Sequence, residues 1–282
     1  MFYHDDRLQY EVEVEEPNPV FAKMLQQAIG GVEGEIRVAM QYMFQAWAIP
    51  DEHAEYRAMV MDTAAEELGH IEMLATAVSK NLEGSPLSLA DVSNDGEMGL
   101  ATLAGMQPRQ ILSTGLNAMP VDSNGVPFNG SWVVASGNLA ADMYANIMAE
   151  STGRLLATRL HEMTDDPGMK DMLEYLIARD TMHQNQWVEL LKSLGDPEEL
   201  LDVHPIPDSF PDEVENQEFN YAFLSTNAER QDDPGMPWTE GESPDGEGTF
   251  SYTTQHDIEG APRNVDKADP QTFNEPAPQD ED

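Results

Sequence analysis

The segment DTAAEELGHIEMLA, residues 62–75, places Glu67 and His70 three positions apart in a stretch with helical periodicity. Residues three apart lie on one face of a helix, so these two side chains can bind the same metal ion. A charged pair is costly to bury unless something compensates for it, and metal coordination is one such compensation. The positions around the pair are small or apolar, which predicts burial: Ala64, Ala65, Leu68, Ile71, Leu74 and Ala75.

Three more residues belong to the same predicted cluster, and their spacing places them on neighbouring helices. Glu35 precedes Glu67 by 32 residues, and Glu150 precedes His183 by 33 residues. Each interval is about the length of one helical hairpin. Each hairpin would carry a glutamate on its first helix and a histidine on its second. Two hairpins packed face to face would bring three carboxylates and two imidazoles to one point, which is the ligand supply for two metal ions. Taken alone, each glutamate is more often a surface or ion-paired residue than a ligand.

The fourth predicted helix carries a variation of the same motif, because Asp180 lies three residues before His183. In di-iron carboxylate bundles both motifs are Glu-x-x-His. The aspartate side chain is one methylene shorter, so we expect Asp180 to hold His183 or a metal-bound water instead of bridging two metals. Glu66 and Glu72 flank the first motif at less favourable positions, and we expect them at the solvent or at interfaces.

Four segments of the sequence are predicted to form long helices. Asn18-Pro19 and Asp166-Pro167 each combine an N-cap residue with proline at the first helical position. Three glycines, at positions 30, 31 and 34, lie inside the first segment. Each costs about 1 kcal/mol relative to alanine, so together they require close backbone packing or a local distortion. The segments are 18–49, 51–82, 136–164 and 166–194.

The second and third helices are joined by residues 84–137, a stretch rich in Gly, Pro, Asn and Ser. A connection of this length lets two consecutive helices run in the same direction, which is the ferritin-like arrangement. The fold class is therefore predicted to be all-α: a ferritin-like four-helix bundle with one long crossover, followed by an extended irregular C-terminal arm. Within the crossover, the composition is compatible with a short helix over residues 98–118 and with an extended course for SWVVASGN, residues 131–138.

The composition changes after Gly195, which predicts a bundle over residues 1–195 and a separate arm over residues 196–282. The arm contains 24 acidic and 3 basic residues. Aromatic residues nevertheless recur along it, more often than is typical of a disordered tail. We therefore expect an extended arm that packs on the bundle or on neighbouring subunits and frays near residue 275. Disorder throughout the arm is the alternative.

The chain is strongly acidic, with 53 Asp and Glu against 14 Lys and Arg among 282 residues, a net charge of −39. Nucleic acids and anionic membranes require positive surface, so neither is a predicted partner. Self-repulsion of this size destabilises a compact state at low ionic strength, and we expect a halophilic protein that works in molar salt. The sequence shows no apolar run of about 18 residues, no signal peptide and no cysteine, which favours a cytoplasmic location.

Five stretches of the sequence, in order and at matching spacing, resemble the manganese catalases, a family of ferritin-like enzymes. That family disproportionates hydrogen peroxide to water and dioxygen at a pair of manganese ions, and it assembles as hexamers whose C-terminal arms embrace neighbouring subunits. The resemblance therefore implies an oxidoreductase with hydrogen peroxide as substrate, two manganese ions per subunit and a homohexamer. The stretches are GGVEGEIRVAMQYMFQAW (30–47), DTAAEELGHIEM (62–73), ILSTGLNA (111–118), SGNLAADM (136–143) and ARDTMHQNQ (178–186).

The resemblance also implies how the five clustered residues divide between the metals. Glu35 and His70 would bind one manganese ion, Glu150 and His183 would bind the other, and Glu67 would bridge the two. Oxygen and imidazole donors bind iron as well as manganese, so the ligands alone do not decide which metal is present. Only the resemblance favours manganese.

Two residues beside the ligands are implied to assist catalysis. Tyr42 matches a tyrosine that hydrogen-bonds a ligand carboxylate. Asp180 stands where family members commonly carry a glutamate that accepts protons, and the shorter acid can still act through one water.

Ala149 replaces an arginine that closes off the site in some members, which implies more open access. Some members bind calcium between subunits, but Ala58 and the STNAE stretch at 225–229 lack the required carboxylates, so no calcium is predicted.

Two other functions remain open alongside a manganese catalase. A di-iron peroxidase related to rubrerythrin would use the same donors, although the second Glu-x-x-His motif and a cysteine site for a rubredoxin-type centre are both missing. A non-catalytic, coat-like structural protein would keep the bundle without turnover. The polar cluster argues against the structural protein, because a chain that needs only the fold could bury leucine there at less cost.

Overall fold

The computed structural model describes residues 7–85, 108–195, 221–225, 232–242 and 248–254. The chain divides into two compact units, residues 1–208 and 209–282, and each is described by itself. The described part of the first unit is mostly helical, and that of the second contains short strands. None of the described helices is long and apolar enough to cross a membrane.

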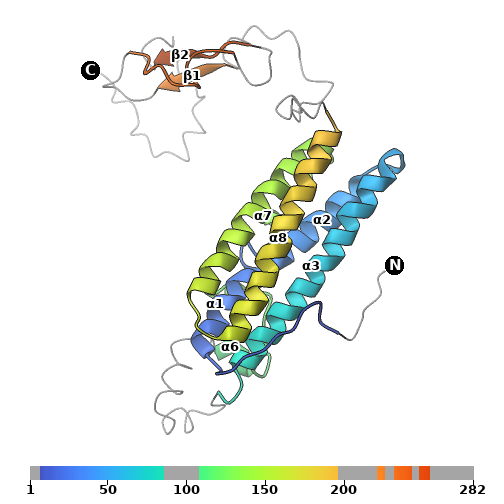
Figure 1. Ribbon diagram of the computed structural model, residues 1–282, viewed down its shortest axis with the longest axis vertical. Helices are drawn as coiled ribbons and strands as arrows, with labels where there is room; N and C mark the ends of the chain where they lie inside the picture. Colours follow the sequence, from blue (N-terminus) through green and yellow to red (C-terminus); the bar gives the residue numbers. More distant parts are fainter. Residues whose placement is uncertain (1–6, 86–107, 196–220, 226–231, 243–247, 255–282) are drawn as a thin grey trace, which may run out of the picture. The chain divides into compact units, whose positions relative to one another are not determined.

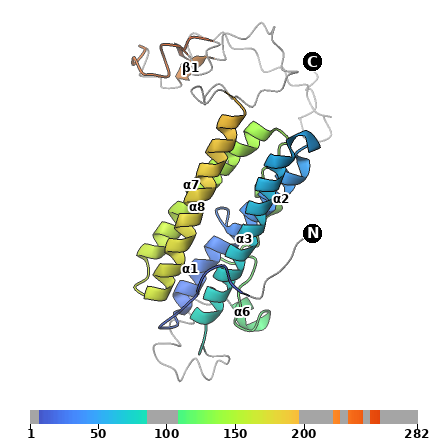
Figure 2. The same ribbon diagram turned by 45° about the vertical axis from the view of Figure 1, so that its right-hand side comes forward.

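Long helices run lengthwise along the first unit, with α2 packed on α3 and α7 packed on α8 (Figures 1 and 2). Helix α1 also packs on α3. This mostly helical arrangement confirms the coarse form of the predicted fold class. The elements are α1 (Pro19–Gly30), α2 (Glu35–Ala48), η1 (Asp51–His53), α3 (Ala54–Asn81), α6 (Pro108–Leu112), η2 (Gly130–Trp132), α7 (Leu139–Glu162) and α8 (Pro167–Ser193).

The first predicted helical segment is two helices in the structure, and the break between them is the local distortion that its three glycines predicted. Gly31 ends α1, and Gly34 precedes the first residue of α2. At Gly30 the backbone of Val121, from the crossover, approaches so closely that a Cβ would lie 2.5 Å from it. The glycines therefore permit both the close packing and the distortion, and the break makes Glu35 the first residue of α2.

The predicted caps lie at the starts of the first and last long segments. The side chain of Asn18 accepts hydrogen bonds from the backbone N–H groups of Val20 at 3.0 Å and Phe21 at 3.1 Å. The side chain of Asp166 accepts one from the N–H of Met169 at 3.0 Å. Both caps satisfy donors that the first helical turn leaves unpaired, which fixes where α1 and α8 begin.

Apolar side chains form two core clusters, and the candidate site lies between them along the helices. On α8, Leu176 belongs to the first cluster and Trp187 to the second, with His183 between them. On α3, Met73 and Ala64 likewise belong to different clusters, and the predicted ligands of that helix fall between them. The bundle therefore encloses the polar residues with apolar packing on both sides.

The described part of the crossover includes an extended stretch against α2. The N–H of Val134 donates to the side chain of Gln41 at 3.1 Å, and its carbonyl accepts from the side chain of Gln45 at 2.8 Å. SWVVASGN thus begins with the short turn η2 and then follows the extended course. A short helix was expected over residues 98–118. The described part of that range contains the short helix α6, and residues 98–107 lie outside the described part of the chain.

The described part of the second unit contains a two-stranded parallel sheet. Strand β1 (Ala222–Ser225) pairs with β2 (Ser251–Thr254) in a register that places Ala222 opposite Ser251. The rings of Phe223 and Tyr252 stack at a centroid distance of 6.3 Å. The fraying expected near residue 275 lies outside the described residues.

Candidate metal centre

Side chains from four helices meet inside the first unit. The ligand atoms of Glu35, Glu67 and His70 lie within 4.8 Å of one another, and so do those of Glu67, Glu150 and His183. Helix α2 supplies the first residue, α3 the next two, α7 the fourth and α8 the last. Because Glu67 belongs to both groups, two metal ions bound there would share it.

The cluster is shielded from solvent. Four of its side chains are almost completely buried, and Glu35 is half-buried at the start of α2. Glutamate is rarely buried without a partner, so several of them around one point require positive charge from metal ions or protons. The buried members are Glu67, His70, Glu150 and His183.

The imidazole nitrogens of the cluster are not satisfied by protein groups. His70 Nδ1 lies 2.6 Å from one oxygen of Glu67, and His183 Nδ1 lies 2.9 Å from the other. Within the described residues, however, neither histidine nor Glu67 makes a side-chain hydrogen bond of acceptable geometry. A buried polar atom without a partner costs about 1–3 kcal/mol. Metal coordination would satisfy the Nδ1 atoms and the oxygens of Glu67, so the donor set fits manganese or a similar ion.

The crowding of carboxylates changes their protonation in the metal-free protein. Burial and then the nearby charge of Glu67 raise the pKa of Glu150 to about 8 and that of Glu35 well above its usual range. Burial acts to raise the pKa of Glu67 as well, but His70 and His183 lower it to about 2. Glu67 is therefore the ionised carboxylate of the metal-free cluster, and its neighbours hold protons.

The two histidines carry the matching positive charge. Burial acts to lower the pKa of each ring, but the charge and contacts of the nearby glutamates outweigh it. The pKa of His183 is raised to about 10, and that of His70 is raised well above its usual range. Metal binding requires neutral imidazole, so metal ions and protons compete for these nitrogens.

Glu150 is held by two aromatic side chains. The hydroxyl of Tyr42 donates to Glu150 Oε1, and Trp187 Nε1 donates to the same oxygen at 3.2 Å. The two rings contact each other at a centroid distance of 4.9 Å. Tyr42 thus contacts the carboxylate of a candidate ligand, and its catalytic role stays a prediction. Trp187 was not predicted, although it follows His183 by four residues and so shares its helix face.

Asp180 is buried near the cluster, where it feels the charges of its members. Burial and then the negative charge of Glu67 raise the pKa of Asp180 to about 7. A Cβ added at Gly153 would lie 3.4 Å from Asp180 Oδ2, so the glycine leaves little spare space beside the carboxyl group. A carboxyl group with a pKa near neutrality can both accept and release a proton.

Glu66 is partly exposed, as expected, but it also contacts residues of the cluster. Arg179 donates to both of its oxygens, from Nε at 2.6 Å and from Nη2 at 3.2 Å. Glu66 Oε2 also lies 3.2 Å from His183 Nε2, and Oε1 lies 3.6 Å from His70 Nε2. Glu66 keeps a quarter of its side chain exposed, and the ion pair and the histidines hold it beside the cluster.

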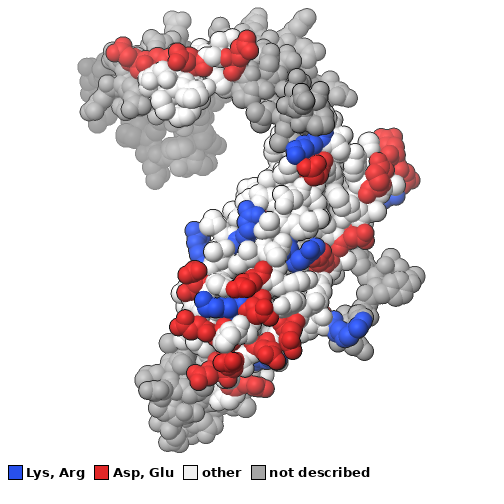
Figure 3. Space-filling model, viewed as in Figure 1, with Lys and Arg blue, Asp and Glu red and all other residues white. Residues whose placement is uncertain are grey.

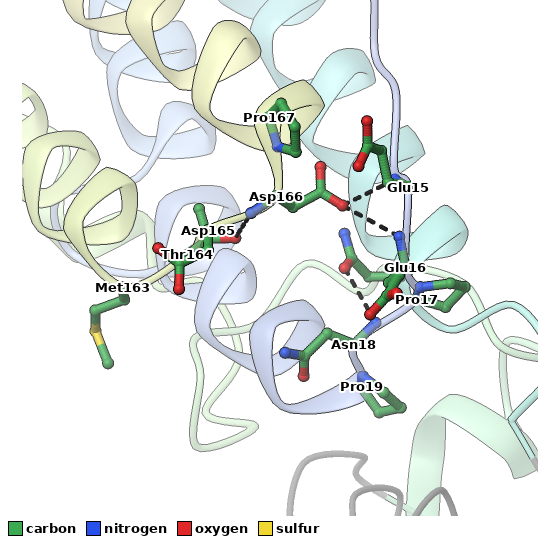
Figure 4. Close-up of a pocket in the computed structure, with 11 residues that line it drawn as sticks. Glu15, Glu16, Pro17, Asn18, Pro19, Met163, Thr164, Asp165, Asp166 and Pro167 are labelled. Atoms are coloured by element: carbon green, nitrogen blue, oxygen red, sulfur yellow. Dashed lines mark hydrogen bonds between the residues drawn. The ribbon is translucent and has the colours of Figure 1, made fainter.

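A separate acidic pocket of about 560 Å³ lies between the N-terminal segment and the turn that joins α7 to α8 (Figure 4). Its central acid is Asp166, which caps α8 and also accepts from the backbone N–H groups of Glu15 at 2.8 Å and Glu16 at 3.2 Å. These bonds occupy both oxygens of the carboxylate. We interpret these hydrogen bonds as a structural link between the N-terminal segment and the start of α8.

Comparisons with known proteins agree on one family. A sequence model described as manganese containing catalase matches residues 1–280. The chain is 44% identical to a manganese catalase from Bacillus subtilis over 255 residues, covering 90% of this chain and 91% of that protein. It is 34% identical to a manganese catalase from Lactiplantibacillus plantarum over 275 residues, covering 97% and 99%. The crystal structure of wild-type KatB, a manganese catalase from Anabaena, has a TM-score of 0.68 at 26% identity and covers 90% of this chain and 99% of that one.

Proposed function

The chain belongs to the manganese catalase family, and from that membership we propose which of its residues hold the two manganese ions. The protein is an oxidoreductase that converts two molecules of hydrogen peroxide to two of water and one of dioxygen. Bound manganese supplies the exchange of electrons with peroxide. The remaining question is what the side chains of this chain contribute.

We assign Glu35 and His70 to one manganese ion, Glu150 and His183 to the other, and Glu67 to both. The observation that carries this assignment is the position of Glu67, which is common to both groups of ligand atoms. In both histidines Nδ1 is the atom that faces Glu67, so Nδ1 is the proposed metal-binding nitrogen.

Two further residues are proposed to act on the bound ligands and substrate. Tyr42 holds Glu150 in place through its hydroxyl, with Trp187 bonded to the same oxygen. Asp180 is proposed to take a proton from peroxide and return it to the product water, because its buried carboxyl group lies beside the cluster, three residues before His183 on α8.

Replacing Glu67 with glutamine tests the assignment directly. The variant should bind less manganese and release dioxygen about 100-fold more slowly or worse, because a neutral amide is a poor bridge between two cations. Far-UV circular dichroism should show unchanged helix content. Glu55→Gln is the matched control, since it makes the same change at an exposed position of α3. Full dioxygen release by Glu67→Gln would show that another residue joins the metals.

We also propose that the protein functions at high salt in the cytoplasm. Its net charge is −39, and Figure 3 shows acidic side chains spread over the visible face of the molecule, with fewer basic ones. Concentrated salt screens the repulsion among such charges. The cytoplasmic location is proposed because the chain contains no cysteine and so forms no disulfide bonds.

We further propose a homohexamer in which residues 196–282 act as an arm that packs on the bundle or on neighbouring subunits. The support is the recurrence of aromatic residues along an otherwise acidic segment, and the short parallel sheet shows that part of it is ordered. Sedimentation equilibrium of the full chain in molar salt measures the number of subunits. A monomer under those conditions would contradict the proposal.

A further inference from the structure

The two histidine rings of the cluster present their second nitrogens to the same carboxylate. His70 and His183 stack with a centroid distance of 5.8 Å and an interplanar angle of 22°. Their Nδ1 atoms face Glu67, whereas their Nε2 atoms face Glu66, at 3.6 Å from Oε1 and 3.2 Å from Oε2. The histidines therefore lie between two consecutive glutamates of α3.

Arg179 fixes the carboxylate of Glu66 from the far side. Its Nε contacts Oε1 at 2.6 Å and its Nη2 contacts Oε2 at 3.2 Å, so each oxygen faces one guanidinium nitrogen and one imidazole nitrogen. A paired fork of this kind sets the plane of a carboxylate as well as neutralising its charge. Arg179 lies on α8 and Glu66 on α3, so the pair also joins the two helices that carry the histidines.

We propose that Glu66, held by Arg179, is a positioning residue that orients His183 through its Nε2 atom at 3.2 Å when manganese is bound, and that acts on His70 at 3.6 Å through its charge. This inference rests on the proposed manganese site. An imidazole that binds metal through Nδ1 carries its proton on Nε2, and a carboxylate that receives this proton's hydrogen bond fixes the ring and strengthens it as a ligand. Glu67 would then contact the histidines on the side that binds metal, and Glu66 would contact them on the opposite side.

The first test is Glu66→Gln, with Glu55→Gln as the matched change at an exposed position of α3. The glutamine keeps one acceptor oxygen but presents an amide N–H group where a second acceptor is needed. We expect manganese affinity about 10- to 100-fold weaker and an altered electron paramagnetic resonance spectrum of the manganous protein, with unchanged helix content by far-UV circular dichroism. Wild-type affinity and spectrum in Glu66→Gln would overturn the proposal.

A double-mutant cycle tests whether Arg179 acts through Glu66. Arg179→Met alone should weaken manganese binding, because the carboxylate loses the partner that sets its orientation. In the double variant Glu66→Gln/Arg179→Met, the loss of affinity should equal that of Glu66→Gln alone. Fully additive losses would show that the two residues act independently and would overturn the role given to Arg179.

The same measurements separate this inference from the proposed site itself. If Glu67→Gln loses manganese while Glu66→Gln binds it normally, the site stands and the positioning role fails. If Glu67→Gln binds both ions as tightly as the wild type, the proposed ligand set fails first, and the role of Glu66 fails with it.

Discussion

Glu67 is the residue on which the candidate centre depends. It is buried, it contacts two histidines, and its pKa is lowered to about 2 although burial acts in the opposite direction. In the metal-free protein the protonated histidines balance this charge. Manganese would replace those protons, and the binding of metal should therefore release protons to the solvent.

The protonation of the cluster predicts how the metal-free protein depends on pH. The pKa values of Asp180, Glu150 and His183 are raised to about 7, 8 and 10. A raised pKa in the folded state gives stability at low pH that is lost as pH rises through that value. We therefore expect the melting temperature of the metal-free protein to fall by several degrees between pH 6 and pH 9.5.

Thermal unfolding at constant high salt measures this dependence, with the manganese-loaded protein beside it. The loaded protein should lose less stability, because metal ions take the place of the protons. Asp180→Asn is the control, since it removes the group that titrates near pH 7. A metal-free protein whose melting temperature stays constant or rises over this range would contradict the protonation described for the cluster.

Lengthening Asp180 tests whether the shorter acid limits turnover. Asp180→Glu restores the side chain that the sequence resemblance implies, and we expect dioxygen release equal to or above that of the wild type. The carboxylate already lies 3.4 Å from the position of a Cβ at Gly153, so the variant depends on the space that this glycine leaves. A large loss of activity with normal manganese content would show that the site is matched to aspartate.

The sequence predicted the residues whose spacing follows helix geometry. It did not predict the contacts that depend on packing between helices. Glu67 and His70 share a face by their separation of three. The contact of Glu66 with Arg179 could not be predicted, because it joins α3 to α8 and no local pattern reveals it. Trp187 could have been found from its spacing to His183, but a tryptophan on a helix more often belongs to the core.

At the scale of the elements, the break between α1 and α2 is the feature that positions the site. The caps at Asn18 and Asp166 were predictable because capping is local chemistry. The glycines predicted a distortion of the first helical segment, but not the close approach of Val121 to Gly30 from about ninety residues away along the chain. The sequence shows the glycines that such a contact requires, but it does not show the direction in which the helix turns.

Adding a methyl group at Gly30 tests that contact. In Gly30→Ala the new Cβ would meet the backbone of Val121 at 2.5 Å, and backbone cannot move aside cheaply. We expect a loss of about 1–3 kcal/mol in the free energy of unfolding, measured by denaturant titration in molar salt. Gly130→Ala is the control, since a Cβ there meets nothing within 4 Å. Equal stability of the two variants would contradict the close packing of the crossover.

At the scale of the whole molecule, charge sets the conditions under which the fold is stable. The net charge of −39 gives strong self-repulsion, which salt screens over a distance of about 3 Å at 1 M and about 30 Å at 0.01 M. The repulsion follows from the composition of the whole chain and does not depend on where any one side chain lies.

Dialysis from molar salt into dilute buffer tests the role of charge. We expect loss of helical circular dichroism or dissociation of the oligomer, with recovery when salt is restored. Sodium chloride and potassium chloride should act alike if screening is the cause. A protein that keeps its structure and its dioxygen release in dilute buffer would contradict the proposal that it is adapted to high salt.

We infer that this chain disproportionates peroxide at two manganese ions held by Glu67 and its neighbours. An oxygen electrode measures dioxygen released from hydrogen peroxide in molar salt, with the manganese and iron content determined on the same sample. We predict one dioxygen for every two peroxides consumed and about two manganese ions per chain. Peroxide consumption without dioxygen, or no turnover with both manganese ions bound, would contradict the claim.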